Sequence, residues 1–462
     1  MHHFVNFKNF ADAQINLLNP VTLLIGRNGA GKSNVIEAVE LLAYLAQGHS
    51  VHQISDVGRG SGTTFEIRGG FRSCPRREHL AYHPDDELFG PQTFTLAFDA
   101  RVDQQPMRYS IEVDVSGKPH IANESLKWGG RVLFETVADA ATADADILSV
   151  RHDNFARGKN KPTRAMTADQ SVLSRYESLS TSDNDTAQKA MTVVRGVRSH
   201  LQHAYVFDPN PRLMRNYENV GQTQLFRDGS NLASVLFELE RSAVKLEKEP
   251  PSNPSSFEPI QGSPRTTLKL IRDRIRQLPE DAFTELTFEQ TRLGEVGLGF
   301  RYSDTSVLGA RQMSDGTLRA LAILTALETV PQGSRLVVEE IDNGIHPARV
   351  KTLVDAVWET ARRRRLNVLA TTHNPATLDQ LDAEQIQGVV LCFHDGSQNA
   401  SRLLPVPELP AAESLLEQGR LGELMTQQVL ERHVQPDFAK KRTEKGLAWL
   451  KKLKHAPSET SR

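Results

Sequence analysis

Cysteine is nearly absent from this chain, whose 462 residues include only Cys74 and Cys392 and no CxxC pair. This scarcity argues against a disulfide framework and against a zinc site built from thiolates. No apolar run approaches the roughly 20 residues of a membrane-spanning helix. The N-terminus also lacks the basic segment and long apolar segment of a signal peptide. We therefore expect a reducing, cytoplasmic setting.

An excess of one charge is also lacking, since 55 Lys and Arg residues stand against 57 Asp and Glu residues, giving a formal net charge of -2. Hydrophobic residues make up 39% of the chain and charged residues 24%, as in ordinary globular proteins. This length suits two or three domains. Any contact with nucleic acid must come from a local basic patch.

Apolar runs that stop at polar residues predict buried strands at 21–25, 336–338 and 368–370. Helical spacing of apolar residues predicts a helix from about residue 31. Alternating residues predict strands between about 63 and 134, and we expect the polar segment 138–185 to be loop with some helix. Helical patterns dominate 187–278, and strands resume near 285. This order predicts βαβ units and a parallel sheet.

One octapeptide carries a specific chemistry. Gly26-Arg27-Asn28-Gly29-Ala30-Gly31-Lys32-Ser33 fits G-x-x-x-x-G-K-[ST] at every fixed position, between a predicted buried strand and a predicted helix. The glycines let backbone N–H groups turn toward phosphate oxygens, with the positive end of a helix dipole behind them. We expect Lys32 to reach the β- and γ-phosphates and the Ser33 hydroxyl to bind Mg²⁺.

Three further polar segments follow in the second half of the chain. Glu339 and Glu340 end one predicted buried strand, and we assign Glu339 to Mg²⁺ through water and Glu340 to polarising the attacking water. Ser314-Asp315-Gly316 opens a predicted helix, where a hydroxyl and free N–H groups form a second anion site. His373 ends another buried strand and can hydrogen-bond a γ-phosphate. Alone, these segments fit solvated acids, a helix cap and a structural histidine; their order and spacing favour nucleotide chemistry.

With these motifs in this order, the chain resembles the ABC-type ATPases of the SMC, RecF and OLD group, which include single-chain AAA ATPases of bacterial anti-phage systems. The resemblance covers about residues 4–400. It rests on the phosphate loop, Ser314 to Thr317 and Thr372-His373, and on Phe7-Lys8-Asn9-Phe10, Asn34-Val35-Ile36-Glu37-Ala38, Asp228-Gly229-Ser230-Asn231-Leu232 and Glu340-Ile341-Asp342-Asn343-Gly344-Ile345-His346-Pro347.

The resemblance implies ATP and Mg²⁺ as cofactors and a head-to-head dimer closed by ATP. It makes Ser314, Asp315 and Gly316 part of a signature loop that binds the γ-phosphate held by the other subunit. It also makes Asn343 to Pro347 the loop where subunits meet, and His373 a switch histidine. Glu339 stands where the family usually has Asp, and Met313 and Asp315 depart from the Leu and Gly of transporter-type signatures.

The predicted fold is an α/β, ABC-type P-loop ATPase head with a mixed or parallel sheet, split by a mainly helical insertion. Residues 1–160 and 285–405 form its two lobes, 161–284 the insertion, and 406–462 a C-terminal extension. Its tail from Lys440 to Lys454 is basic, with Trp449 and leucines at near-helical spacing, and fits a solvated tail, a partner-docking segment or a nucleic-acid contact.

Two functional hypotheses follow. In the first, the ATPase dimer is the sensor or regulator of a separately encoded effector, a nuclease, in anti-phage defence, because no Asp-x-Asp cluster of a Toprim nuclease follows His373. In the second, it is a RecF- or SMC-like repair or replication ATPase that binds DNA directly. An ABC transporter subunit is disfavoured by the N-terminal strands and the form of the insertion. Neither hypothesis includes a membrane.

Overall fold

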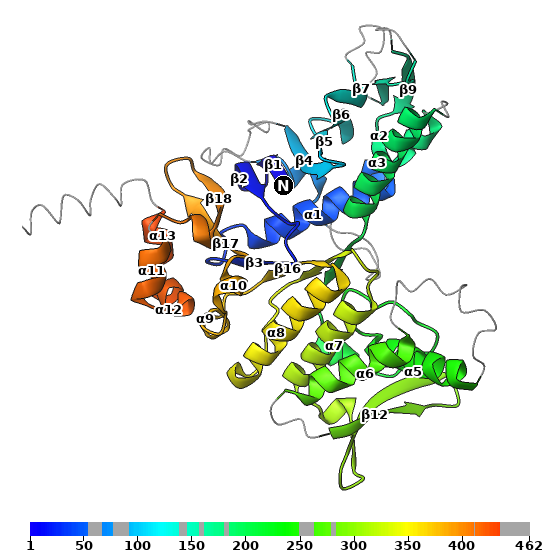
Figure 1. Ribbon diagram of the computed structural model, residues 1–462, viewed down its shortest axis with the longest axis vertical. Helices are drawn as coiled ribbons and strands as arrows, with labels where there is room; N and C mark the ends of the chain where they lie inside the picture. Colours follow the sequence, from blue (N-terminus) through cyan, green and yellow to red (C-terminus); the bar gives the residue numbers. More distant parts are fainter. Residues whose placement is uncertain are drawn as a thin grey trace, which may run out of the picture.

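The computed structural model describes residues 1–53, 67–76, 92–137, 146–156, 161–179, 184–248, 263–278, 283–410 and 412–434. A six-stranded sheet lies in the middle of the molecule, in the order β10-β15-β16-β3-β17-β18 (Figure 1). Its strands are β3 (Val21–Ile25), β10 (Ala204–Phe207), β15 (Arg335–Val338), β16 (Asn367–Thr371), β17 (Val389–Asp395) and β18 (Ala400–Pro405). All neighbouring pairs are parallel except β17 and β18. The predicted α/β class with a mixed sheet is confirmed.

Both faces of the middle sheet are covered, which explains why its strands are continuous apolar runs. Val21, Leu23 and Ile25 belong to one hydrophobic core, with residues of the helices on that face. Leu24 belongs to the other core, beside α1 (Lys32–Gln47) and a second sheet. The helices on the first face are α7 (Asp315–Thr329) and α8 (Pro347–Arg364), and α5 (Leu232–Lys248) and α6 (Pro264–Arg276) join the same core by packing against α7.

The second sheet is an antiparallel one of eight strands in the order β2-β1-β4-β5-β6-β7-β8-β9. They are β1 (His2–Phe7), β2 (Phe10–Ile15), β4 (Thr93–Val102), β5 (Gln105–Asp114), β6 (His120–Trp128), β7 (Arg131–Thr136), β8 (Ile147–His152) and β9 (Thr163–Thr167). The expectation of loop with some helix at 138–185 is wrong for β8 and β9. Four of the five residues of β9 are exposed, so that strand has no apolar alternation to reveal it.

After β9 the chain passes through α2 (Val172–Arg175) and α3 (Asp185–Gln202) to β10, which pairs with β15 at one edge of the middle sheet. It continues through α4 (Pro211–Met214) to a third sheet. That sheet contains β11 (Glu218–Asn219), β12 (Phe283–Gln290), β13 (Glu295–Tyr302) and β14 (Val307–Gly309). The segment 161–284 therefore contributes β9 and β10 to the two larger sheets besides its helices. The boundaries at 160 and 284 stay a prediction.

The C-terminal extension packs beside the middle sheet (Figure 1). Its helices α11 (Ala412–Gln418), α12 (Leu421–Thr426) and α13 (Val429–His433) follow α9 (Pro375–Leu378) and α10 (Ala383–Ile386) in the chain. The backbone N–H of Gly422 donates to Asp379 Oδ1 at 2.8 Å, which ties α12 to the end of α9. The basic tail at 440–454 lies outside the described residues. Within the described ranges, no helix combines the length and the apolar character that crossing a membrane requires.

Candidate nucleotide-binding site

Three neighbouring parallel strands deliver the predicted site residues to one edge of the middle sheet. β3 ends at the phosphate loop, β15 ends one residue before Glu339, and β16 ends two residues before His373. Because β16 lies between β3 and β15, the ends of all three strands meet at the same edge. Open α/β sheets bind ligands outside the carboxyl ends of their strands.

The phosphate loop adopts a conformation that its glycines permit. Gly26 has φ +138°, and a Cβ there would lie 2.0 Å from the carbonyl oxygen of Cys392. Gly31 has φ +115°, and a Cβ there would lie 2.7 Å from the side chain of Asn9. Asn9 Nδ2 donates to the Ala30 carbonyl at 3.2 Å, and Asn34 Nδ2 donates to Asn9 Oδ1 at 2.7 Å. Asn9 therefore holds the phosphate loop from the turn between β1 and β2 of the neighbouring sheet. In the sequence it stands out only as part of a motif.

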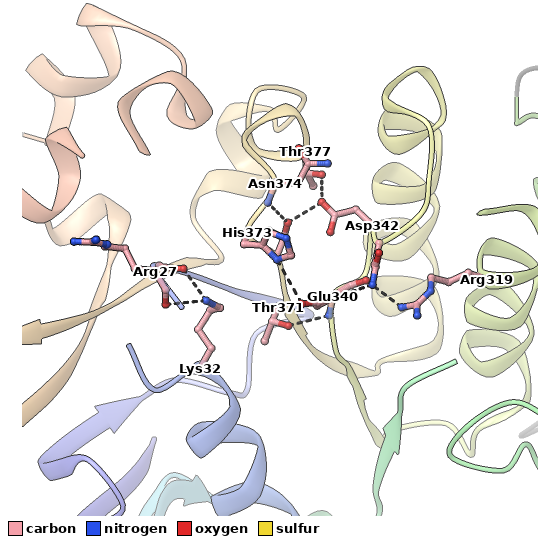
Figure 2. Close-up of polar contacts among 12 residues, drawn as sticks. Arg27, Lys32, Arg319, Glu340, Asp342, Thr371, His373, Asn374 and Thr377 are labelled. Atoms are coloured by element: carbon pink, nitrogen blue, oxygen red, sulfur yellow. Dashed lines mark hydrogen bonds and ion pairs between the residues drawn. The ribbon is translucent and has the colours of Figure 1, made fainter. Parts of the chain in front are cut away.

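Lys32 opens α1 and turns its ammonium group back over the loop. Its Nζ donates to the carbonyls of Gly26 at 2.6 Å and Arg27 at 3.1 Å (Figure 2). Burial lowers the pKa of Lys32, and the nearby groups Cys392, Glu340 and Glu431 oppose that effect. The ammonium is thus held by two backbone carbonyls of the phosphate loop itself.

Glu340 lies opposite the phosphate loop and is held by residues of two elements. Its backbone has φ +47°, and its N–H donates to Thr371 Oγ1 at 2.9 Å. Its carboxylate accepts a hydrogen bond from Asn343 Nδ2 at 2.8 Å and lies 3.5 Å from His373 Nδ1 (Figure 2). The side chains of Glu340 and His373 are 46% and 52% exposed, so the carboxylate and the imidazole are open to water.

Glu339 points into a more enclosed, acidic region. Its pKa is raised first by burial and then by Asp208 and Glu340, while Arg227 and Arg68 act in the opposite direction. The carboxylates of Asp208 and Glu340 thus add negative charge around Glu339, and the two arginines offset part of it. Oxygen donors of the Ser33 and Glu339 kind are those that Mg²⁺ prefers. Among the described residues, no group of three or more His, Cys, Asp or Glu side chains is placed to hold a metal ion.

Arg227 and Glu40 lie next to this acidic region and were not found from the sequence. Arg227 Nη1 donates to Glu40 Oε1 at 2.6 Å, and burial raises the pKa of Glu40 to about 7. The motif that begins at Asp228 explains the position of Arg227. Asn231 is fully buried and folds the turn by accepting from the Phe226 N–H at 2.8 Å, while the Arg227 carbonyl accepts from the Asp208 N–H at 2.8 Å.

The predicted signature loop is built as a helix N-terminus. Ser314 Oγ accepts from the Thr317 N–H at 3.1 Å and so caps α7. Arg215 donates to Asp315 Oδ1 at 2.6 Å and to the Met313 carbonyl at 2.8 Å. Across the described residues, no hydrogen bond or ion pair joins Ser314, Asp315 or Gly316 to the phosphate loop of the same chain. The structure therefore brings together Lys32, Glu340 and His373, whereas the signature loop packs against the loop that follows Glu340 and makes no direct bond to the phosphate loop within the described ranges.

Glu431 of α13 also faces the phosphate loop. Burial raises its pKa, and Arg27 and Lys32 act to lower it. Its Oε2 atom is buried, with no hydrogen-bond partner among the described residues. In Figure 2 the side chain of Arg27 points away from Lys32 toward the C-terminal helices. No sequence pattern indicates this proximity, because Glu431 lies about 400 residues from the loop and belongs to no motif.

A phosphate loop at the end of a buried parallel strand, with the acidic residues of a neighbouring strand beside it, defines a P-loop ATPase of mixed α/β fold. The chain belongs to the family described as "AAA domain, putative AbiEii toxin, Type IV TA system", which matches residues 21–379.

Two curated relatives are called DNA replication and repair protein RecF. The protein of Gloeobacter violaceus is 45% identical over 84 residues, which are 16% of this chain and 22% of that protein. That of Rippkaea orientalis is 35% identical over 100 residues, 18% of this chain and 26% of that protein. The chain therefore matches about a quarter or less of each relative's length.

Solved structures with similarity include the SMC head domain from Thermotoga maritima, at 10% identity and a TM-score of 0.38, covering 87% of this chain and 97% of that one. Another is the Smc head domain with an extended coiled coil, bound to the C-terminal domain of ScpA, from Pyrococcus furiosus. It has 11% identity and a TM-score of 0.42, and covers 90% of this chain and 98% of that one.

Proposed function

We propose that this protein binds and hydrolyses ATP with Mg²⁺ and uses the cycle to control a separate effector. The observation that carries the first part is the position of Glu340, whose carboxylate lies 3.5 Å from His373, accepts from Asn343, and is near enough to Lys32 to act on its pKa. A carboxylate in this position can orient a water molecule for attack on a γ-phosphate held at Lys32.

In this mechanism the side chains of the site divide the work of binding phosphate and orienting water. Lys32 exchanges the carbonyls of Gly26 and Arg27 for phosphate oxygens, and the loop N–H groups bind the remaining phosphate charge. Glu340 orients the water, and His373 holds that carboxylate and hydrogen-bonds the γ-phosphate. Ser33 and Glu339 would hold Mg²⁺, which would supply positive charge against the phosphates.

We further propose that two copies close head to head around their nucleotides. The support is that Ser314 and its neighbours form an anion-binding helix N-terminus without contacting the chain's own phosphate loop. A second copy, related to the first by a two-fold axis, supplies its helix N-terminus to the phosphates bound by the first copy. The first copy does the same for the second.

The effector is, in this proposal, a separately encoded nuclease of a cytoplasmic anti-phage system, held inactive until a trigger alters the dimer. The family description supports an effector system of this kind, because that description names a toxin of a toxin–antitoxin system. A second candidate function is direct DNA binding in repair or replication, which the local similarity to RecF proteins favours.

One set of experiments separates these functions. The purified chain is assayed for phosphate release, nuclease activity and DNA binding at several salt concentrations, and is co-expressed with the products of the adjacent genes. We expect Mg²⁺-dependent ATPase activity that Lys32→Ala abolishes, no nuclease activity, and co-purification of an adjacent product. If this chain alone cleaves DNA and a point mutation within it removes the cleavage, the proposal that it regulates a separate nuclease is contradicted. Tight DNA binding that weakens steeply with salt, without a protein partner, favours the repair function.

A further inference from the structure

A cavity with a volume of about 560 Å³ opens on the third sheet, and none of its lining residues belongs to the phosphate loop. This volume lies in the range of small-molecule sites, roughly 300–1,000 Å³. Its lining includes three arginines, Arg215, Arg301 and Arg311, and two aromatic residues, Tyr217 and Phe288. Neither the sequence motifs nor the proposed ATP site uses this cavity.

The charge of the cavity is positive. Glu289 is the one carboxylate in its lining, and it already accepts a hydrogen bond from the Tyr217 hydroxyl at 2.7 Å. Arg301 has only a long contact of 3.5 Å with the exposed Glu285. Arg311 makes no hydrogen bond or ion pair within the part of the chain that the structure describes. Guanidinium groups suit phosphate, because two N–H groups of the planar guanidinium can bind two phosphate oxygens at once.

Gly297, Leu298 and Gly299 of β13 form part of the cavity's lining. A Cβ on Gly297 would lie 2.7 Å from Cε1 of Tyr217, so the glycine lets the tyrosine ring lie directly on β13. A Cβ on Gly299 would lie 2.7 Å from Thr287 Oγ1 and 3.1 Å from Val307 Cγ1, so this strand also packs closely against its neighbours. A ring face of this kind offers a planar ligand a surface for stacking.

We propose that this cavity is a second ligand site, which binds a phosphorylated molecule of nucleotide size. Its phosphate groups bind among Arg301, Arg311 and Arg215, and its planar body lies against Tyr217. The site is separate from the phosphate loop and takes its ligand without hydrolysis.

Arg215 connects the cavity to the predicted signature loop. It lines the cavity and also donates to Asp315 Oδ1 at 2.6 Å and to the Met313 carbonyl at 2.8 Å. A bound phosphate competes with these acceptors for the guanidinium and so alters the loop that precedes α7. Ligand at this site therefore changes the ATPase rate, an inference that rests on the proposed function.

Counting bound nucleotide tests the site without relying on turnover. Equilibrium dialysis of the full chain against radiolabelled ADP should give two ADP per chain for the wild type. It should give one for Lys32→Ala, one for Arg301→Ala/Arg311→Ala, and none for the combined variant. Arg292→Ala, an exposed arginine in the turn between β12 and β13, is the matched control and should keep two. One ADP per wild-type chain with none for Lys32→Ala overturns the proposal.

A photolabel locates the second nucleotide. Azido-ADP bound to Lys32→Ala protein should label a peptide containing Tyr217 or residues 295–312, and unlabelled ADP should prevent this. Labelling confined to other peptides overturns the site. Since both measurements omit hydrolysis, their failure leaves the ATPase proposal standing. If two sites are counted but ligand at the second leaves the ATPase rate unchanged, only the coupling through Arg215 is wrong.

Discussion

Gly316 lies directly against the backbone of Gly344: a Cβ added to Gly316 would stand 2.4 Å from the Gly344 carbonyl oxygen. The first residue belongs to the predicted signature loop, and the second to the loop that follows Glu340. The two loops therefore touch without an intervening side chain. A displacement of either loop moves the other.

Gly316→Ala should uncouple these loops, since even one methyl group forces the two backbones apart. We expect nucleotide binding to persist, because the phosphate loop is unaffected, and hydrolysis to fall by about tenfold or more, as when catalytic groups are misplaced by about 1 Å. Titration with fluorescent nucleotide and measurement of phosphate release check this. Gly196→Ala on α3, where a Cβ meets open space, is the control and should hydrolyse ATP normally. A normal rate in Gly316→Ala would contradict the coupling.

Glu340→Gln should keep nucleotide binding and slow hydrolysis by about 100-fold or more, as expected for loss of a water-orienting carboxylate. The amide preserves the shape of the side chain but no longer carries the charge beside His373. Single-turnover phosphate release measures the effect. Glu177→Gln, a surface carboxylate paired with Arg195, serves as the control. Wild-type hydrolysis in Glu340→Gln would refute the assignment.

Ser314→Arg should block hydrolysis without blocking nucleotide binding, since it adds bulk and charge where a partner's phosphate would approach. Mixing it with Lys32→Ala protein should restore part of the activity, because a mixed dimer keeps one intact composite site. Rates are compared for each variant alone and for co-expressed, differently tagged subunits purified as mixed dimers. No recovery in those mixed dimers would indicate a site completed within one chain.

Glu431→Gln should tighten nucleotide binding by about threefold to tenfold, the size of a partly screened charge interaction. In the structure this carboxylate faces Arg27 and Lys32, and so competes with phosphate for the same cations. Isothermal titration with ADP measures the dissociation constant. Glu423→Gln, exposed on α12, is the matched control and should leave it unchanged. An unchanged or weaker affinity in Glu431→Gln would show that the carboxylate does not compete.

Stability should fall as the pH drops below 6.5, because two histidines near Arg335, the buried His2 and the half-buried His200, are neutral in the folded protein. Burial is the main cause that lowers the pKa of His200 to about 3 and the pKa of His2 well below its usual value. With folded pKa values below the unfolded value of about 6.5, the stabilisation is complete above pH 6.5 and is lost toward pH 3.

Each such histidine contributes a slope of about 1.4 kcal/mol per pH unit in that range. Urea unfolding at pH 7.5 and 5.5 should show this loss, and His200→Gln should reduce the difference between the two pH values. His394→Gln, an exposed histidine, should not. Equal stability at both pH values in the wild type would exclude the effect.

The parts of the fold that the sequence revealed are those with a strong local pattern. The run 21–25 forms β3 with the predicted bounds, and the runs near 337 and 369 form β15 and β16. β10 was missed inside a helical region because only one of its four residues is fully buried. Its strand state depends on pairing with β15, about 130 residues later in the chain, and no local pattern encodes that pairing.

The candidate site divides in the same way. Motifs located Lys32, Glu340 and His373, because each motif is a pattern of a few neighbouring residues that can be read locally. The roles of these three residues stay predictions. Asn9 and Glu431 reach the phosphate loop from distant parts of the chain, so their contacts exist only after folding.

The place of β3 in the middle sheet sets the order in which the protein can fold. It pairs with β16 through Val21 and Val368, and with β17 through Leu23 and Val389. Its neighbours thus leave the ribosome more than 340 residues after it does. Pairings across such sequence distances are slow to form, since a long loop must close first. During synthesis, β3 and the loop that follows it therefore lack their neighbouring strands until most of the chain has been made. A product truncated before β16 cannot assemble the nucleotide site.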